Sequence, residues 1–193
     1  VGSRTGLRQE YNFSISAANE KSSFYVSLGY LGNEGITEGS DLKRLTGRLK
    51  ADYQAKKWMK VGANMSYARF DSNSLGNNGA STSTANVWAF TTQMAPIYPA
   101  YVRNADGSIM LDGNGIGMMD YGSGINAGMQ RPFIPDANPI QDNKLNTRNA
   151  EGNALSGNAF VDITPLPGLK VTLNGTFNLD ETRFTYVYNP YYG

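Results

Sequence analysis

Apolar and polar residues alternate in six proline-free runs of this chain. An alternation of period two predicts a β-strand, because successive side chains of a strand point to opposite faces of a sheet. In each run the bulky apolar residues hold one parity, and small or polar residues hold the other. The predicted strands occupy residues 11–18, 23–30, 45–53, 59–69, 155–163 and 169–180.

The connections between these runs alternate between short and long. Three of them are short turns, at Asn19–Ser22, Ala55–Lys57 and Thr164–Gly168. The other two are longer, at Gly32–Asp41 and over residues 72–149. In an up-and-down sheet, alternate connections lie at opposite ends, so all short turns fall on one side and all long loops on the other. Outer-membrane β-barrels have this asymmetry, with short periplasmic turns and longer extracellular loops.

Two architectures share such an alternating pattern, a membrane barrel and a soluble β-sandwich. Sandwich strands are typically about 5–6 residues long, whereas a tilted strand that crosses a bilayer needs about 9–11. The runs here have roughly the longer length, which favours the membrane barrel. The polar parity also carries charged and amide side chains, as a wet barrel lumen requires, although the outer face of a sandwich has the same character. These residues are Arg48, Lys50, Asp52, Lys60, Asn64, Asn158, Lys170 and Asn174.

Composition narrows the range of functions. The mean hydropathy of −0.42 does not exclude a barrel, because only every second residue of a barrel strand faces lipid. A net charge of +1 gives no reason to expect a nucleic-acid partner. The chain has neither histidine nor cysteine, so the usual general base, the thiol nucleophile and the favoured zinc ligands are missing. We therefore expect no enzyme, no catalytic residue, no metal site and no cofactor.

The long connection contains structure of its own. Helical spacing of apolar residues predicts a short helix over residues 81–95, with Ser81 or Ser83 as its N-cap and Pro96 as its stop. An extended segment at Ile97–Val102, a turn at residues 104–107 and a second segment at Ser108–Leu111 predict a small hairpin. From residue 112 to 149 the chain is rich in Gly, Asn and Asp, and we expect it to pack mainly against its neighbours.

Several motifs occur in one order along most of the chain. They are Tyr11-Asn12-Phe13-Ser14-Ile15-Ser16, Asn19-Glu20-Lys21, Tyr25-Val26-Ser27-Leu28-Gly29-Tyr30, Glu34-Gly35-Ile36, Leu49, Trp58-Met59-Lys60-Val61-Gly62-Ala63-Asn64, Ala95-Pro96-Ile97-Tyr98-Pro99, Asp106-Gly107, Asp120-Tyr121-Gly122 and Pro167-Gly168-Leu169-Lys170. Together they resemble the barrel region of SusC/RagA-type TonB-dependent transporters, which are nutrient importers of the Bacteroidetes outer membrane.

The resemblance implies an all-β fold, an antiparallel up-and-down transmembrane β-barrel of roughly 22 strands with a plugged lumen. About six strands of that larger barrel are expected here. Residues 1–71 would supply strands one to four, and residues 150–185 strands five and six. Residues 72–149 would form a long extracellular loop with the short helix, and residues 186–193 would begin the next loop. We see no signal peptide, plug or closing strand, and expect an internal fragment.

The resemblance also implies a function, the TonB-dependent import of glycan or peptide fragments across the cell outer membrane. Its expected partners are a SusD-like surface lipoprotein, the TonB complex through a plug absent from this chain, the remaining barrel segments, the lipid bilayer and the glycan or peptide ligand. Aromatic side chains of the long loop are the candidate substrate contacts, because flat rings stack on sugars or apolar side chains. They are Trp88, Tyr98, Tyr101, Tyr121 and Phe133.

Other interpretations of these features remain open. The loop aromatics, Phe90 included, would equally serve as the loop's own small core. Aromatic residues near the strand ends are better explained as an interfacial girdle, namely Tyr30, Tyr53, Trp58 and Tyr67. For the whole chain, the alternatives are a secreted or surface β-sandwich that binds carbohydrate through its loops, and a passive porin without TonB coupling.

Overall fold

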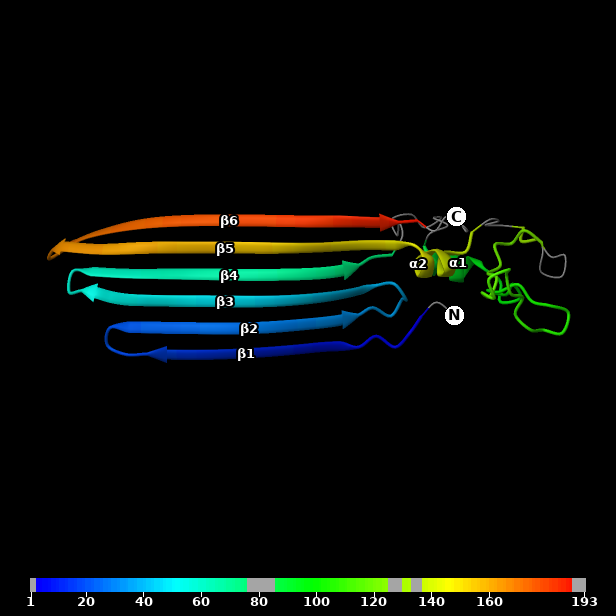
Figure 1. Ribbon diagram of the computed structural model, residues 1–193, viewed down its shortest axis with the longest axis horizontal. Coiled ribbons are helices and arrows are strands. Elements are labelled where there is room, and N and C mark those ends of the chain that lie inside the picture. Colours follow the sequence, from blue (N-terminus) through cyan, green and yellow to red (C-terminus); the bar gives the residue numbers. More distant parts are fainter. Residues whose placement is uncertain (1–2, 76–85, 125–129, 133–136, 189–193) are drawn as a thin grey trace.

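The computed structural model describes residues 3–75, 86–124, 130–132 and 137–188. Six strands form one antiparallel sheet in chain order, and each pairs with its neighbours in the sequence (Figure 1). This arrangement confirms the six predicted strands and the up-and-down topology. The strands are β1 (Arg8–Ala18), β2 (Ser22–Glu34), β3 (Asp41–Lys56), β4 (Met59–Asn73), β5 (Thr147–Leu166) and β6 (Leu169–Val187).

The three short turns lie at one end of the sheet and the longer loops at the other (Figure 1). In the β1–β2 turn, the side-chain oxygen of Asn19 accepts hydrogen bonds from the backbone N–H groups of Lys21 and Ser22, at 2.9 and 2.7 Å. The β5–β6 turn has Pro167 followed by Gly168, whose φ of +85° suits a residue without a Cβ atom. Local residue chemistry therefore determines where the chain reverses.

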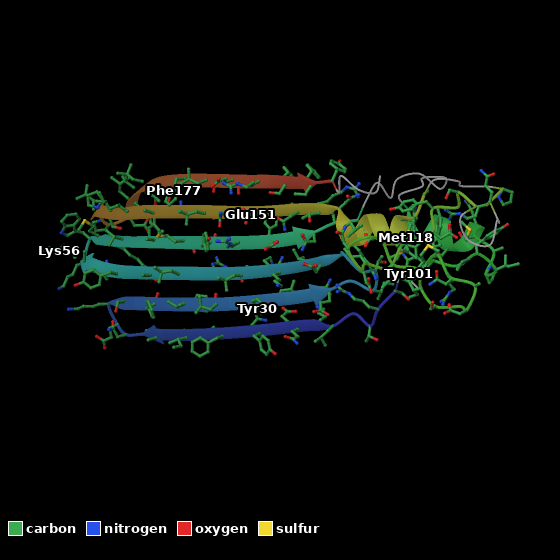
Figure 2. All side chains as sticks on the ribbon, turned by 45° about the vertical axis from the view of Figure 1, so that its right-hand side comes forward. Tyr30, Lys56, Tyr101, Met118, Glu151 and Phe177 are labelled. Atoms are coloured by element: carbon green, nitrogen blue, oxygen red, sulfur yellow. The ribbon has the colours of Figure 1, made fainter. Side chains whose placement is uncertain are left out.

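The two faces of the sheet differ in character. Register pairing places most of the bulky residues of the six strands on one face, which we call the apolar face, for example Phe13 beside Leu28 and Leu155 beside Leu179. Many of these side chains are exposed, with Phe13 at 58% and Leu179 at 63%. Side chains project from both faces of the sheet, and within the described residues no second sheet covers either of them (Figure 2). This single layer contradicts the β-sandwich alternative, in which the apolar faces of two sheets are buried against each other.

The apolar face carries a band of limited height. The band runs from the register row of Ile163 and Val171 to the row of Leu155 and Leu179. At about 3.3 Å per residue this distance is roughly 26 Å along a strand, and a tilt of about 40° reduces it to about 20 Å across a bilayer. The apolar band of outer-membrane barrels is about 25 Å tall. The band is therefore somewhat shorter than that of a typical barrel, and the aromatic row of Tyr11 and Tyr30 lies at its edge.

Charged residues replace apolar ones on this same face immediately beyond the band, on the side of the long loops. Arg69 occupies one register row with Asn153, and Glu151 lies opposite Arg183 in the next row. Glu151 forms ion pairs with both arginines, at 3.7 Å to Arg69 and 3.6 Å to Arg183. The change from apolar to charged side chains marks the level at which the strands leave the hydrocarbon.

The opposite face, which we call the polar face, carries paired charges and hydroxyls. Near the short turns, Lys60 forms an ion pair with Asp52 at 2.8 Å, and Lys170 forms one with Asp162 at 2.9 Å. Ser66 and Ser156 share a hydrogen bond of 2.5 Å across β4 and β5. Polar partners across neighbouring strands suit a surface in contact with water.

The buried core lies in the long connection rather than in the sheet. Its members come from several short segments, and they are Val87, Phe90, Val102, Met119, Ala137 and Ile140. Two helices contribute to it, α1 (Val87–Gln93) and α2 (Pro139–Leu145), which lie beyond the loop end of the sheet (Figure 1). Within the described residues, no helix has the length and apolar character needed to span a membrane.

The loop departs from the sequence prediction in three places. Helix α1 begins at Val87 with Asn86 as its N-cap, and Ser81 and Ser83, which were predicted as caps, lie outside the described residues. The predicted extended segment from Ile97 is wrong at its start, because Tyr98 N–H donates to the carbonyl of Ala95 at 3.1 Å and closes a turn. Helix α2 was not predicted.

The predicted turn at residues 104–107 is confirmed. Gly107 N–H donates to the carbonyl of Asn104 at 2.9 Å, and Gly107 has a φ of +84°. The carboxylate of Asp106 accepts bonds from the hydroxyl and the backbone N–H of Ser108, which lower the pKa of Asp106 below its ordinary value. The flanking segments pair only through isolated bridges, such as Arg103 with Ile109.

Candidate functional site

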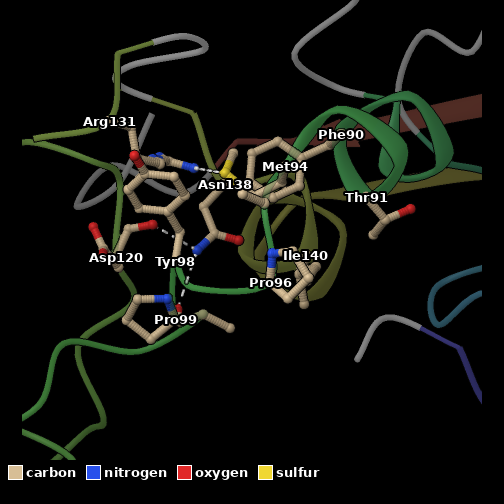
Figure 3. Close-up of a pocket in the computed structure, with 12 residues that line it drawn as sticks. Phe90, Thr91, Met94, Pro96, Tyr98, Pro99, Asp120, Arg131, Asn138 and Ile140 are labelled. Carbon is tan, nitrogen blue, oxygen red and sulfur yellow. Dashed lines mark hydrogen bonds between the residues drawn. The ribbon is translucent and has the colours of Figure 1, made fainter.

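A cavity of about 310 Å³ lies in the loop body, between α1, α2 and the segments that connect them (Figure 3). Its walls combine apolar side chains with three buried polar ones and the exposed Thr91. The apolar part includes Phe90, Met94, Pro96, Pro99 and Ile140, and the polar part Asp120, Arg131 and Asn138. Tyr98 also lines the cavity, so one of the predicted substrate contacts lies there.

The polar side chains of the cavity are deeply buried. Arg131 is 4% exposed, Asp120 5% and Asn138 1%. A buried charge is costly unless hydrogen bonds or opposite charges compensate it. The Arg131 guanidinium donates to the carbonyl of Ala137 at 2.7 Å and lies 5.3 Å from the ring centre of Phe90, a cation–π arrangement. The guanidinium is therefore held against the first helix of the loop.

Asp120 and Asn138 fix the backbone around the cavity. The Asp120 carboxylate accepts a bond of 2.6 Å from the N–H of Gly122, and the Asn138 amide donates 3.0 Å to the backbone carbonyl of Asp120. Asn138 also donates to the carbonyl of Ala100 at 3.3 Å. These bonds join three segments that are far apart in the sequence, and they make the polar side of the cavity a built structure rather than a gap.

Gly122 explains why the motif Asp120-Tyr121-Gly122 ends in glycine. Its φ is +84°, and a Cβ atom added there would lie 2.1 Å from Nε of Arg131. Only glycine allows the guanidinium to pack so closely. The motif therefore serves to place Arg131 and Asp120 at the cavity.

The remaining predicted contacts do not meet at the cavity. Trp88 lies on α1 and is 51% exposed. Tyr101 pairs with Met119 through a backbone bridge, and its ring lies against Gly117. Tyr121 has a buried hydroxyl, and Phe133 lies outside the described residues. Their contact with substrate stays a prediction.

Sequence reasoning overlooked most of the residues that form the cavity. Asp120 was noted only within a motif, Phe90 was interpreted as packing, and Arg131 and Asn138 were not singled out. The sequence contained little indication of these residues, because a single arginine in a polar loop belongs to no repeating pattern of side chains. Within the described residues, no group of three or more acidic side chains is arranged to hold a metal ion.

The chain was compared with known proteins by sequence and by structure. No family model matches the chain. TonB-dependent receptor P26 of Formosa agariphila is 29% identical over 183 residues, which cover 92% of this chain and 16% of that receptor. TonB-dependent receptor P39 of the same organism is 38% identical over 60 residues, or 31% of this chain and 6% of that receptor.

Two solved structures share the fold. The RagAB peptide importer in its open-open state superposes with a TM-score of 0.64 and 24% identity, over 95% of this chain and 19% of that one. In its closed-closed state the TM-score is 0.58, again with 24% identity, over 94% and 18%. Over nearly its whole length the chain is therefore similar to a TonB-dependent receptor, and it has the fold of part of the RagAB importer.

The fold shared with these barrel proteins gives the two faces of the sheet a physical meaning. The apolar face is the lipid-facing outside of a barrel wall, and the polar face is the inside. The chain spans about a fifth or less of the length of the relatives and structures that it matches. The relatives are named as receptors and importers, and none of these names describes an enzyme.

Two of the motifs shared with the SusC/RagA type meet in the cavity. The segment Ala95–Pro99 forms one wall, and Asp120, the first residue of the Asp120–Gly122 motif, contributes to another. The chain therefore has a cavity at the long-loop end of its sheet, where residues of these two motifs come together.

Proposed function

We propose that this receptor imports oligomeric nutrients, either glycan or peptide fragments, across the outer membrane with energy supplied through TonB. The observation that carries the proposal is the sheet itself, with an apolar band on one face and polar residues on the other, in a chain that is similar over 92% of its length to a TonB-dependent receptor. RagAB, which shares the fold, is named a peptide importer, so the proposal retains peptides beside glycans.

The proposal assigns a place to each part of the chain. Residues 1–71 and 150–185 form wall, residues 72–149 an extracellular loop, and residues 186–193 begin the next one. The resemblance to SusC/RagA-type proteins supports a SusD-like lipoprotein above the loops and a plug that contacts TonB. The remaining strands of the barrel and the lipid bilayer would cover the unpaired edges of β1 and β6 and the apolar face.

In this proposal the loop cavity receives part of the nutrient. Its apolar walls favour burial of a ring or an apolar side chain, while Asp120, Arg131 and Asn138 offer polar groups for orientation. Tyr98 is the one predicted contact that supports this role by its position. A cavity with a few convergent polar groups in a mostly apolar lining is the usual form of a ligand site.

Uptake by whole cells tests the transport function. Cells that contain the receptor should take up labelled oligosaccharides or oligopeptides that cells without its gene exclude. Collapse of the proton-motive force with an uncoupler should stop this uptake, because the outer membrane has no energy source of its own. Uptake that continues after the uncoupler would instead indicate a passive porin.

The role of the cavity in ligand binding is tested by a substitution that fills it with a larger side chain. Thr91 lines the cavity, whereas its neighbour Thr92 does not, and both hydroxyls donate to the carbonyl of Trp88. Thr91→Trp should weaken ligand binding about tenfold or more by occupying the space, and Thr92→Trp should leave binding unchanged. Equal binding by both variants would exclude the cavity as the ligand site without affecting the transport proposal.

A further inference from the structure

Two aromatic residues alternate at the loop end of β6, Phe184 and Tyr186, and Tyr188 follows one residue beyond the strand. Phe184 lies opposite Ala150 and Tyr186 opposite Arg148 in the register with β5. Even-numbered residues of β6 belong to the polar face, since Leu173 and Leu179 on the odd parity belong to the apolar face. Phe184 and Tyr186 therefore lie on the inside of the barrel wall, beyond the level of the apolar band, and Tyr188 lies next to Arg148 of the same face.

This position excludes the ordinary explanation of aromatic residues in a barrel. Girdle residues face lipid at the edge of the band, and Tyr11 and Tyr30, whose rings are 6.4 Å apart, have that place on the apolar face. Phe184 and Tyr186 project to the other side of the sheet. Nothing in the membrane would be in contact with them.

The rings are exposed, as are all residues of β6, which is the last strand of the sheet in this chain. Phe184 is 62% exposed, Tyr186 57% and Tyr188 65%. The rings of Phe184 and Tyr186 are nearly parallel, with an angle of 3° between their planes and 6.4 Å between their centres. The Arg148 guanidinium lies over Tyr188, 5.8 Å from its ring centre, and adds a cation with several N–H donors.

We propose that these four residues, Arg148, Phe184, Tyr186 and Tyr188, form an aromatic platform that binds the sugar rings of a glycan at the mouth of the barrel. A sugar presents apolar C–H groups to an aromatic ring and hydroxyls around its edge. The exposed rings of the platform can contact the C–H groups, and the guanidinium and the Tyr186 hydroxyl can form hydrogen bonds with the sugar hydroxyls.

The shape of the platform favours a glycan over a peptide. Extended peptides are usually bound by backbone pairing with a free strand edge, together with pockets for alternate side chains. The platform lies on a sheet face, and its rings project more than half exposed instead of forming a hollow. Aromatic rings that recur at every second residue can each stack on one sugar ring of an oligosaccharide.

Binding to the complete receptor in detergent tests the platform directly. The probes are linear hexasaccharides of glucose, mannose and xylose and a pool of synthetic hexapeptides, measured by isothermal titration calorimetry. At least one hexasaccharide should bind. Tyr186→Ala and Phe184→Leu should each weaken its binding about threefold to tenfold, and Tyr186→Phe should retain most of it.

The matched control is Thr185→Ala, an exposed position on the opposite face of the same strand. It should bind like the unaltered receptor. The proposal is overturned if none of the hexasaccharides binds, if the platform variants bind them as the control does, or if only the peptides depend on Tyr186.

The choice of a nutrient glycan as ligand rests on the proposed transport function, but experiments can disprove the platform and the transport function independently. Energy-dependent uptake together with sugar binding that ignores Tyr186 would remove the platform and leave the transporter. Sugar binding that depends on Tyr186, without any uptake, would retain the platform and remove the transport function.

Discussion

Three glycines of the sheet lie under phenylalanine rings on a neighbouring strand. They are Gly62 under Phe160, Gly152 under Phe70 and Gly157 under Phe177, and a Cβ atom added to any of them would come within 2.5 Å of the ring. Glycine in a strand interior costs conformational entropy, so its presence there needs a reason. The reason here is that each ring covers the backbone of the strand beside it.

This argument predicts opposite effects for two glycines of the apolar face. Gly175 has no atom within 4 Å of an added Cβ, so Gly175→Ala should raise the free energy of unfolding by about 0.5–1 kcal/mol. Gly157→Ala should be less stable than Gly175→Ala by about 1 kcal/mol, because the Phe177 ring must leave its cross-strand contact. Urea unfolding of the receptor in lipid vesicles measures both values, and equal gains would refute the role of the ring.

At the scale of the element, alternation was enough to predict the strands. The face on which a strand residue lies follows from its position among its immediate neighbours in the sequence. The turn residues Asn19 and Gly168 likewise act through neighbouring backbone groups and their own conformation. The strands are nevertheless longer than their alternating parts: β5 has 20 residues and β6 has 19. Pairing with a neighbour extends a strand where its own pattern has already ended.

The loop was predictable only in part, for a physical reason. Helix α1 and the turn at residues 104–107 follow from local spacing and turn chemistry. Helix α2 has seven residues and no apolar repeat long enough to detect, although Asn138-Pro139 is a reasonable helix start. The cavity depends on contacts between Arg131, Asp120 and Phe90, and nothing local relates those positions.

The parity of β6 can be tested with one charge placed on either face. Leu173 is 60% exposed on the apolar face, and its neighbour Asn174 lies on the polar face. Leu173→Arg should destabilise the receptor in a bilayer by about 2–4 kcal/mol, because the charge enters the hydrocarbon. Asn174→Arg, which adds the same side chain on the inside, should cost much less.

Folding into lipid vesicles, followed by the heat-dependent shift in gel mobility, compares the two variants. The same comparison in plain detergent should show a smaller difference, since a micelle adapts to a charge more easily than a bilayer does. A larger loss for Asn174→Arg than for Leu173→Arg would reverse the assignment of the two faces.

At the scale of the whole molecule, the wall continues well beyond the membrane. The band ends near Leu155 and Leu179, yet β5 begins at Thr147 and β6 ends at Val187. About eight residues of each strand therefore rise on the loop side, roughly 26 Å along the strand. Beside them, Lys144 of α2 forms an ion pair of 3.1 Å with Glu38, which connects the loop body to the β2–β3 loop. Such an exposed pair adds at most about 1 kcal/mol, so packing must hold the loop body in place.

The absence of cysteine from the chain makes its orientation in the membrane measurable with single substitutions. Ala105 lies at an exposed loop turn, and Glu20 lies in the short turn between β1 and β2 at the opposite end of the sheet. If the long loops are extracellular, Ala105→Cys should react with a membrane-impermeant maleimide on intact cells. Glu20→Cys should react only after the outer membrane is permeabilised, because the short turns face the periplasm.

Leu173→Cys serves as the control within the lipid band and should react poorly in both conditions, since a maleimide needs the thiolate that hydrocarbon suppresses. Labelling of Glu20→Cys but not of Ala105→Cys on intact cells would show that the sheet has the opposite orientation in the membrane. The cavity and the aromatic platform would then face the periplasm and could not capture an external nutrient.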